Sequence, residues 1–263
     1  MLLPIQYRPQ TAPDSGEFKI QKETLDWNPQ ETALLVCDMW DTHWCRGAVA
    51  RVEELLPTME RVLNVAQEAG IFVIHAPSDT IEFYTDYPQY QLAQKAQQAE
   101  PLTRPALWDA RWQRPSEPAL PVDAKDGGCT EEPFCPQGSP WRRQHPALTI
   151  APQDAISDSG NTVFNLCRER QIENLIIMGV HTNMCVLGRS FGIRAMVQRG
   201  MNVLLIRDLT DTMYNPRSAP FVSHFRGTEL VIEHIERYWC PTITSTAFLG
   251  TPPFRFAEDT HTP

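Results

Sequence analysis

The chain has 263 residues, of which 42% are hydrophobic and 21% charged, and its formal net charge is −9. This composition is typical of a globular protein with a sizeable core, and the length suits one large domain or two small ones. The negative charge argues against nucleic acid as a partner, because such binding needs a basic face. No apolar run approaches the roughly 18 residues that span a bilayer, so we expect no membrane partner either.

Residues 1–7 have neither the basic nor the apolar region of a signal peptide. We therefore expect a soluble protein. The sequence leaves open whether it is cytoplasmic or exported with its signal peptide removed.

The first quarter of the chain contains one strand–helix–strand unit. Residues 1–30 are polar and irregular, and we expect them to form an arm over the surface of the domain. Residues 33–37 are a continuous apolar run of strand length, typical of a strand buried on both faces. Pro57 suits the first turn of a helix that continues at apolar spacing until Gly70, and residues 71–74 form the next strand.

The middle of the chain differs from both flanks. Residues 80–146 are rich in Gln, Pro and Trp, and their apolar residues follow no sustained period. This segment is longer than a connection in a compact domain normally is, so we interpret it as an insertion that covers the sheet edge or roofs the site. A short strand at 147–150 and a helix at 162–171 follow it.

Regular alternation returns in the last third of the chain. We expect strands at 174–178 and 202–206, helices at 186–199 and 229–239, and a last short strand at 241–244. Strands separated by helix-length segments imply right-handed crossovers and a parallel sheet with helices on both faces.

The predicted fold class is therefore α/β, a three-layer α-β-α arrangement around a mainly parallel, Rossmann-like sheet. We predict an N-terminal arm (1–30), one domain (31–248) that carries the insertion, and a C-terminal tail (249–263). In such sheets ligands bind beyond the carboxyl ends of the strands.

A cysteine stands at one of those strand ends. The segment from Gly179 to Cys185 joins a buried strand to a helix that opens near the cysteine. Unpaired N–H groups at a helix N-terminus favour a thiolate and can hold an oxyanion. Asp38, at the end of a neighbouring strand, can accept the thiol proton. Physical chemistry alone leaves a nucleophilic and a buried structural Cys185 equally open, since cysteine is commonly buried.

Two segments carry a resemblance to a known family. Residues 33–39 (ALLVCDM) resemble the first strand and catalytic aspartate of the isochorismatase-like cysteine hydrolases, which include nicotinamidases and N-carbamoylsarcosine amidohydrolase. Residues 175–186 (LIIMGVHTNMCV) resemble their nucleophile segment, and residues 202–208 the following strand. The resemblance covers about residues 30–80 and 147–245.

The resemblance implies a site and a reaction. Cys185 would be the nucleophile and Asp38 the general base. The N–H groups of His181 and Cys185 would form the oxyanion hole, with a cis peptide before His181. We expect hydrolysis of a small amide, more than of a vinyl ether, through a thioester, with a small-molecule substrate, no cofactor and a homo-oligomeric assembly.

The family's third catalytic residue, a lysine, has no counterpart at the expected place. It follows the strand that we predict at 147–150, and residues 151–157 contain no lysine. Lys125, Arg142 and Arg143 are candidate replacements. Loss of one member of a catalytic triad costs orders of magnitude in rate. An alternative is therefore a small-molecule binding protein that keeps the scaffold without hydrolysis.

Residues 38–45 concentrate polar and aromatic groups after the first buried strand. Asp41 and His43, with His181, are candidates for a metal-dependent hydrolase, but the spacing shows no three-ligand set and a polar loop explains them better. The family's Asp-x-His metal motif is incomplete here, because Asp79 has no histidine two residues later. The predicted substrate pocket consists of Trp40, Asp41, His43, Trp44, Asp79 and Tyr214.

Seven cysteines are present. We expect Cys37 and Cys167 to be reduced and buried. For Cys129 and Cys135 we place a disulfide first, free thiols second and a metal site third. His224 is expected in a solvent-exposed loop.

Overall fold

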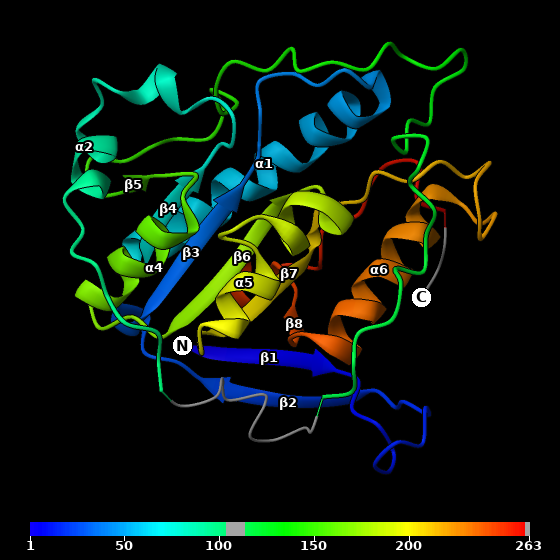
Figure 1. Cartoon of the computed structure of the whole chain (residues 1–263), viewed down its shortest axis with the longest axis horizontal. Coiled ribbons are helices and arrows are strands. Elements are labelled where there is room, and N and C mark those ends of the chain that lie inside the picture. Colours follow the sequence, from blue (N-terminus) through cyan, green and yellow to red (C-terminus); the bar gives the residue numbers. More distant parts are fainter. Residues whose placement is uncertain (104–113, 261–263) are drawn as a thin grey trace.

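The computed structural model describes residues 1–103 and 114–260. Its centre is an eight-stranded sheet in the order β2-β1-β8-β7-β6-β3-β4-β5 (Figure 1). The strands are β1 (Leu2–Tyr7), β2 (Gln21–Asp26), β3 (Thr32–Cys37), β4 (Phe72–Ala76), β5 (Ala155–Ile156), β6 (Asn174–Val180), β7 (Asn202–Asp211) and β8 (Thr242–Ile243). All neighbouring strands are parallel except β1, which pairs antiparallel with β2 and β8.

Helices cover both faces of this sheet. They are α1 (Arg46–Glu68), α2 (Pro88–Gln94), α4 (Gly160–Glu169), α5 (Ile193–Gln198), α6 (His224–Tyr238) and α7 (Thr246–Leu249). In Figure 1, α4 and α5 lie in front of the sheet and α1 lies behind it, where it contacts α7. The predicted three-layer α/β class with a mainly parallel sheet is thus confirmed. Within the described ranges, no helix combines the length and apolarity of a membrane span.

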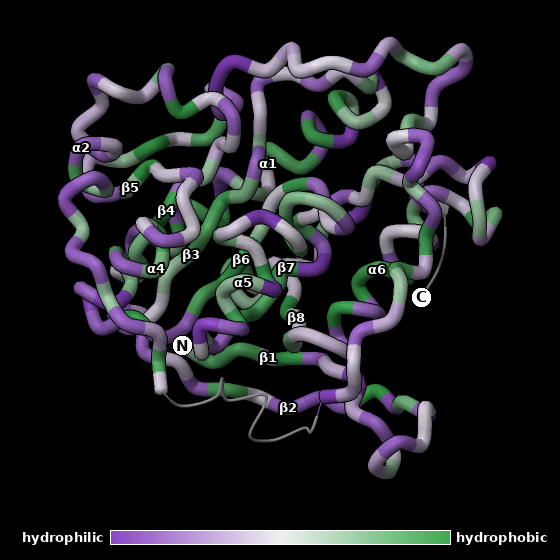
Figure 2. The backbone as a smooth tube through the Cα atoms, viewed as in Figure 1, coloured by the Kyte–Doolittle hydropathy of each residue, from purple (hydrophilic) through white to green (hydrophobic). Residues whose placement is uncertain are grey.

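The central strands form because their sequences are continuously apolar. Every residue of β3 and β6 is buried, as expected for strands covered on both faces. Figure 2 shows the hydrophobic segments gathered along these strands and the polar ones in the outer loops. Gly179 is paired with Cys37 at the carboxyl end of the β3–β6 ladder and has a φ of +124°. A side chain at this position would collide with the backbone of Cys37. The two strands can therefore approach closely where both enter the site.

The N-terminal segment is not the irregular arm that we expected. β1 and β2 form a hairpin that extends the sheet beyond β8. The alternation of exposed and buried residues in β1 explains this, since Leu3 and Ile5 point into the core while their neighbours face solvent.

Helix α1 begins at Arg46, eleven residues before Pro57, so the predicted start is wrong. Its buried face runs through Ala48, Val52 and Leu55 before it reaches the part that we predicted. An interior proline costs a helix about 3 kcal/mol. Burial of that long apolar face offsets the cost.

Two further predictions differ from the structure. Residues 147–150 form no strand; the short strand β5 comes later, at Ala155–Ile156. The helix predicted over 186–199 is divided into a π-helical turn (Thr182–Val186) and α5. Gly192 caps α5, and a side chain at this position would meet the carbonyl oxygens of Val186 and Cys185.

Candidate active site

The site lies where β3, β4 and β6 end side by side. Asp38 directly follows β3, is fully buried and has a φ of +47°. Its backbone N–H donates to the carbonyl of Ala76 at the end of β4 (3.1 Å). Its Oδ1 accepts a hydrogen bond of 2.7 Å from the backbone N–H of Ser78. The bond to Ala76 thus fixes the backbone of Asp38 and the bond from Ser78 fixes its carboxyl group.

The second oxygen of Asp38 is in a different environment. Among the described residues, Oδ2 is buried and accepts no hydrogen bond, while Arg189 Nε lies 3.5 Å away. Burial raises the pKa of Asp38 to about 6, against the opposing effects of the Cys185 thiol, the Ser78 N–H and the Arg189 charge. Asp38 therefore keeps a basic oxygen beside the thiol.

Cys185 lies in the π-helical turn that follows β6. Burial, followed by the negative charge of Asp38, raises the pKa of its thiol to about 12. We expected the helix N-terminus to favour a thiolate; burial outweighs it. The resting site consequently holds a neutral thiol next to a carboxylate, so a proton acceptor is needed for nucleophilic attack.

Arg189 is the site residue that the sequence reasoning missed. It stands four residues after Cys185, and its Nη2 lies 2.7 Å from Asp79 Oδ2 while its Nε faces Asp38. Burial opposes its charge, but the interactions with Asp79, Cys185 and Asp38 outweigh burial and raise the pKa of Arg189. The available signal was its spacing, since residues i and i+4 of a helical turn share one face.

The three expected replacements for the lysine lie elsewhere. Lys125 is largely exposed, with its Nζ 3.9 Å from Asp123 Oδ2. Arg142 donates its backbone N–H to Asp41 Oδ1 (3.0 Å), and Arg143 Nε lies 3.9 Å from Asp41 Oδ2. None of these contacts involves Asp38.

The backbone before Cys185 has the form that the resemblance implied. The Val180–His181 peptide bond is cis. The carbonyl of His181 then accepts from the N–H groups of Met184 and Val186 at 3.0 and 3.2 Å, which closes the turn around Cys185.

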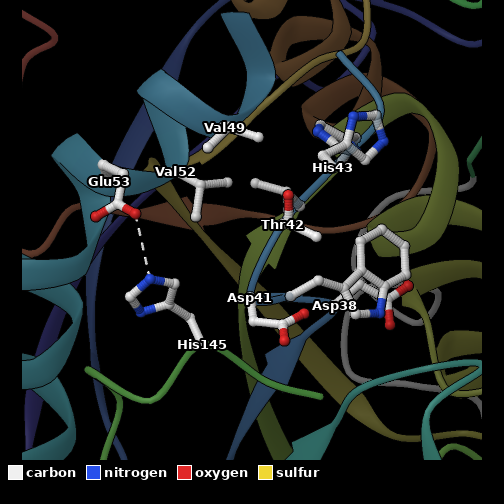
Figure 3. A pocket seen from close by; sticks show the side chains of 11 residues that line it. Asp38, Asp41, Thr42, His43, Val49, Val52, Glu53 and His145 are labelled. Atoms are coloured by element: carbon white, nitrogen blue, oxygen red, sulfur yellow. Dashed lines mark ion pairs between the residues drawn. The ribbon is translucent and has the colours of Figure 1, made fainter. Parts of the chain in front are cut away.

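A narrow pocket opens beside Asp38 and His181 (Figure 3). Part of the predicted insertion closes it: Asp41 donates its N–H to the carbonyl of Arg143 (2.9 Å), and His145 donates to Met39 (2.7 Å). The pocket is lined by Asp38, Trp40, Asp41, Thr42, His43, Val49, Val52, Glu53, His145, Val180 and His181. The end of the predicted insertion, at Arg143 and His145, therefore lies at the pocket, and its residues 104–113 lie outside the described ranges.

Three of the six predicted pocket residues line the pocket, and the other three lie elsewhere. Trp40, Asp41 and His43 line the pocket. Trp44 packs mainly against a small buried cluster, formed by Cys45, Ala48, Cys129, Cys135 and Met213, and against the ring of His43. Asp79 belongs to the Arg189 side of the site.

Tyr214 is not a pocket residue. It is fully buried against Gly227, and its hydroxyl donates to the carbonyl of Ser218 at 2.8 Å. Its role is in packing, which agrees with the turn-like sequence around it.

The candidate metal ligands have local partners. Asp41 accepts from the N–H of Arg142, and His43 Nδ1 accepts from the N–H of Cys45 (3.1 Å). Within the described ranges, no three His, Cys, Asp or Glu side chains are placed to hold a metal ion. The seven cysteines, including Cys129 and Cys135, are free thiols in this structure.

His224 is buried, contrary to the expected exposed loop. Its Nε2 lies 2.8 Å from Asp211 Oδ1, and Arg51 Nε donates to the other carboxylate oxygen at 2.8 Å. These charges lower the pKa of Asp211 below its ordinary range although burial acts to raise it. A second buried ionic cluster therefore lies beside the site.

Comparison with known proteins identifies the family. A model of the isochorismatase domain matches residues 32–226. A cysteine hydrolase from Pseudomonas syringae pv. phaseolicola 1448A has a similar structure, with 18% sequence identity, coverage of 84% of this chain and 93% of that chain, and a TM-score of 0.51. An isochorismatase from Pseudomonas putida KT2440 has 11% identity, coverage of 86% and 94%, and a TM-score of 0.50. No curated protein matches the sequence. At these identities the solved structures support the fold, and the match of the domain model over most of the chain shows that this protein belongs to the isochorismatase family.

Proposed function

We propose that this protein is a cysteine hydrolase that cleaves the C–N bond of a small carboxamide through a thioester at Cys185. One observation carries the proposal: the buried Oδ2 of Asp38, which has no hydrogen-bond partner among the described residues, lies 3.5 Å from Arg189 Nε, and Asp38 and the Cys185 thiol each shift the other's pKa. A general base beside a protonated thiol is the arrangement that nucleophilic cysteine catalysis requires.

Acylation begins with proton transfer. Asp38 removes the thiol proton as the Cys185 sulfur attacks the carbonyl carbon, and the carbonyl π electrons move to oxygen. The N–H groups of His181 and Cys185 hold this oxyanion. Asp38 then passes its proton to the substrate nitrogen, the C–N bond breaks, and an amine or ammonia leaves the thioester.

Deacylation uses the same groups in reverse. Asp38 takes a proton from water as the hydroxide oxygen attacks the thioester carbonyl. The C–S bond breaks, the sulfur recovers the proton, and a carboxylic acid leaves. Asp38 must therefore be ionised in the resting enzyme, and its pKa of about 6 permits this at neutral pH.

Arg189 supplies the positive charge beside Asp38 that the lysine supplies in the family. Its positive charge opposes the effect of burial on Asp38, in addition to the larger effects of the Cys185 thiol and Ser78, and so favours the ionised carboxyl. A guanidinium does not give up its proton in proteins, so all proton transfer falls to Asp38. The missing lysine was the reason to consider a binding protein without hydrolysis; a cation at this place favours the hydrolase.

The test is a screen of small primary amides for release of ammonia, followed by trapping of the acyl-enzyme. We expect turnover of at least one amide and a mass adduct on the Cys185 peptide. Cys185→Ser should abolish both, while Cys167→Ala, which removes a buried thiol on α4, should keep them. Undiminished turnover in Cys185→Ser would falsify the proposal.

A further inference from the structure

We infer that His43 is a specificity-determining residue that donates a hydrogen bond from Nε2 to an acceptor atom of the substrate, away from the scissile bond. The inference rests on the proposed hydrolase function and names the substrate class for that site: small carboxamides that carry a second acceptor, such as a ring nitrogen or a carbonyl oxygen.

The hydrogen bond from Cys45 determines the tautomer of His43. The Cys45 backbone N–H donates to Nδ1 at 3.1 Å. A backbone N–H can only donate, so Nδ1 carries no proton, and the proton of the neutral ring is on Nε2. Burial and the nearby Arg51 charge lower the pKa of His43 to about 4, which agrees with a neutral ring. His43 is thus a donor at Nε2 throughout the neutral pH range.

Aromatic contacts hold the ring in one orientation. His43 stacks on Trp141 with ring centroids 5.5 Å apart and planes 12° apart, and Trp141 stacks on Trp40 at 4.3 Å. The ring of His181 meets His43 edge-on at 5.0 Å. A donor whose direction is preset loses little entropy on binding, which is what a specificity contact needs.

His43 lines the same pocket as Asp38 (Figure 3). His181 lines it as well. Several neighbours already have partners: Trp40 Nε1 donates to the carbonyl of Ser78 (2.9 Å), and His145 lies 3.2 Å from Glu53. In the described part of the chain, no protein group accepts from His43 Nε2, so this N–H is available to a ligand.

The chemistry of this donor selects between close analogues. Isonicotinamide and benzamide have the same shape, but only isonicotinamide has an acceptor on the ring. We expect the Cys185→Ser protein to bind isonicotinamide about fivefold more tightly than benzamide, the effect of one net hydrogen bond. The Cys185→Ser protein should bind these amides without hydrolysing them. The affinity ratio therefore tests the role of His43 even if the proposed hydrolase function is wrong.

Two substitutions at position 43 isolate the donor. His43→Gln places an amide N–H near the former Nε2, whereas His43→Asn reaches only the Nδ1 position and keeps an acceptor for Cys45. We expect the preference for isonicotinamide to persist in His43→Gln and to vanish in His43→Asn, both made in the Cys185→Ser background.

NMR of ¹⁵N-labelled histidine gives the decisive readout. We expect the signal that disappears in His43→Asn to show a neutral Nε2–H ring from pH 5.5 to 8.5 and to shift when isonicotinamide is added. A proton on Nδ1, an imidazolium at pH 7, equal affinities for the two amides, or no shift with isonicotinamide would each overturn the inference.

Discussion

Two buried aspartates lie at the ends of the strands that flank β6, and their pKa values are shifted in opposite directions. Asp211, at the end of β7, has Arg51 and His224 at 2.8 Å on its two oxygens, and its pKa falls below the ordinary range. Asp38, after β3, has one oxygen bonded by Ser78 and the other 3.5 Å from Arg189, and its pKa rises to about 6. Equal burial therefore gives a structural anion in one place and a base in the other. The difference lies in how completely each carboxylate is bonded.

The largest contrast should appear in activity. We predict that Asp38→Asn lowers kcat/KM by at least about 10³-fold, as loss of a triad member does, because Asn cannot accept the thiol proton. Amide turnover by the purified variant, set against wild type, measures it. Activity within tenfold of wild type would show that Asp38 is not the base.

For stability we expect the reverse order: loss of the Asp211 charge should cost more than loss of the Asp38 charge. Asp211→Asn leaves the buried Arg51 without its counter-charge, and we expect a loss of about 3–5 kcal/mol in the free energy of unfolding. Asp38→Asn removes a carboxylate that is costly to ionise, so at pH 7 it should leave stability unchanged or raise it by up to about 2–3 kcal/mol. Urea unfolding of both variants provides the comparison. A larger loss in Asp38→Asn than in Asp211→Asn would contradict our account.

Stability should also depend on pH with opposite sign at the two sites. The folded pKa of Asp38 is raised, so its contribution is complete below pH 4 and is lost as pH rises through about 6. The folded pKa of Asp211 is lowered, so its contribution is present above its unfolded pKa near 3.9 and is lost as pH falls further.

Arg189 should contribute to the pKa of Asp38. Removing its charge in Arg189→Gln is expected to raise that pKa, by less than the loss of the Ser78 hydrogen bond would, while Arg189→Lys should change it little. A ¹³C carboxyl titration by NMR follows Asp38 directly. An unchanged midpoint in Arg189→Gln would remove Arg189 from the catalytic site.

The smallest effect is expected at Asp79. Its side chain is 57% exposed, so its ion pair with Arg189 should contribute under about 1 kcal/mol. Asp79→Asn should therefore leave activity within about threefold of wild type. A loss of activity of more than about tenfold would mean that Asp79, and not the turn after Cys185, positions the guanidinium.

The sequence predicted the parts of the fold whose side chains are buried on all sides. β3 and β6 are built on continuous apolar runs and β7 begins with one, and Asp38 and Cys185 follow β3 and β6, so the carboxyl edge of the sheet brings these residues together. β1 was missed because its alternating pattern is short and half exposed, and the start of α1 because Pro57 resembles a helix beginning.

The rest of the site depends on contacts that spacing does not show. In the family the cation follows a strand that we predicted at 147–150, and the strand β5 lies later, at Ala155–Ile156. Arg189 reaches Asp38 because β3 and β6 are neighbours, so the segment after β6 brings Arg189 to the carboxyl group that follows β3. The same holds for two other residues. His224 is paired with Asp211 in β7, and Tyr214 packs against Gly227 in α6.

The central claim is that Asp38 activates a resting thiol at Cys185, and alkylation of Cys185 by iodoacetamide between pH 4 and 10 tests it most directly. Peptide mass spectrometry would report the rate at this cysteine alone. We predict a rate that rises with an apparent pKa near 6 and then stays level in the wild type, with that plateau lost in Asp38→Asn. Matching profiles in the two proteins, each rising only around the free-thiol pKa of about 8.5, would contradict the claim.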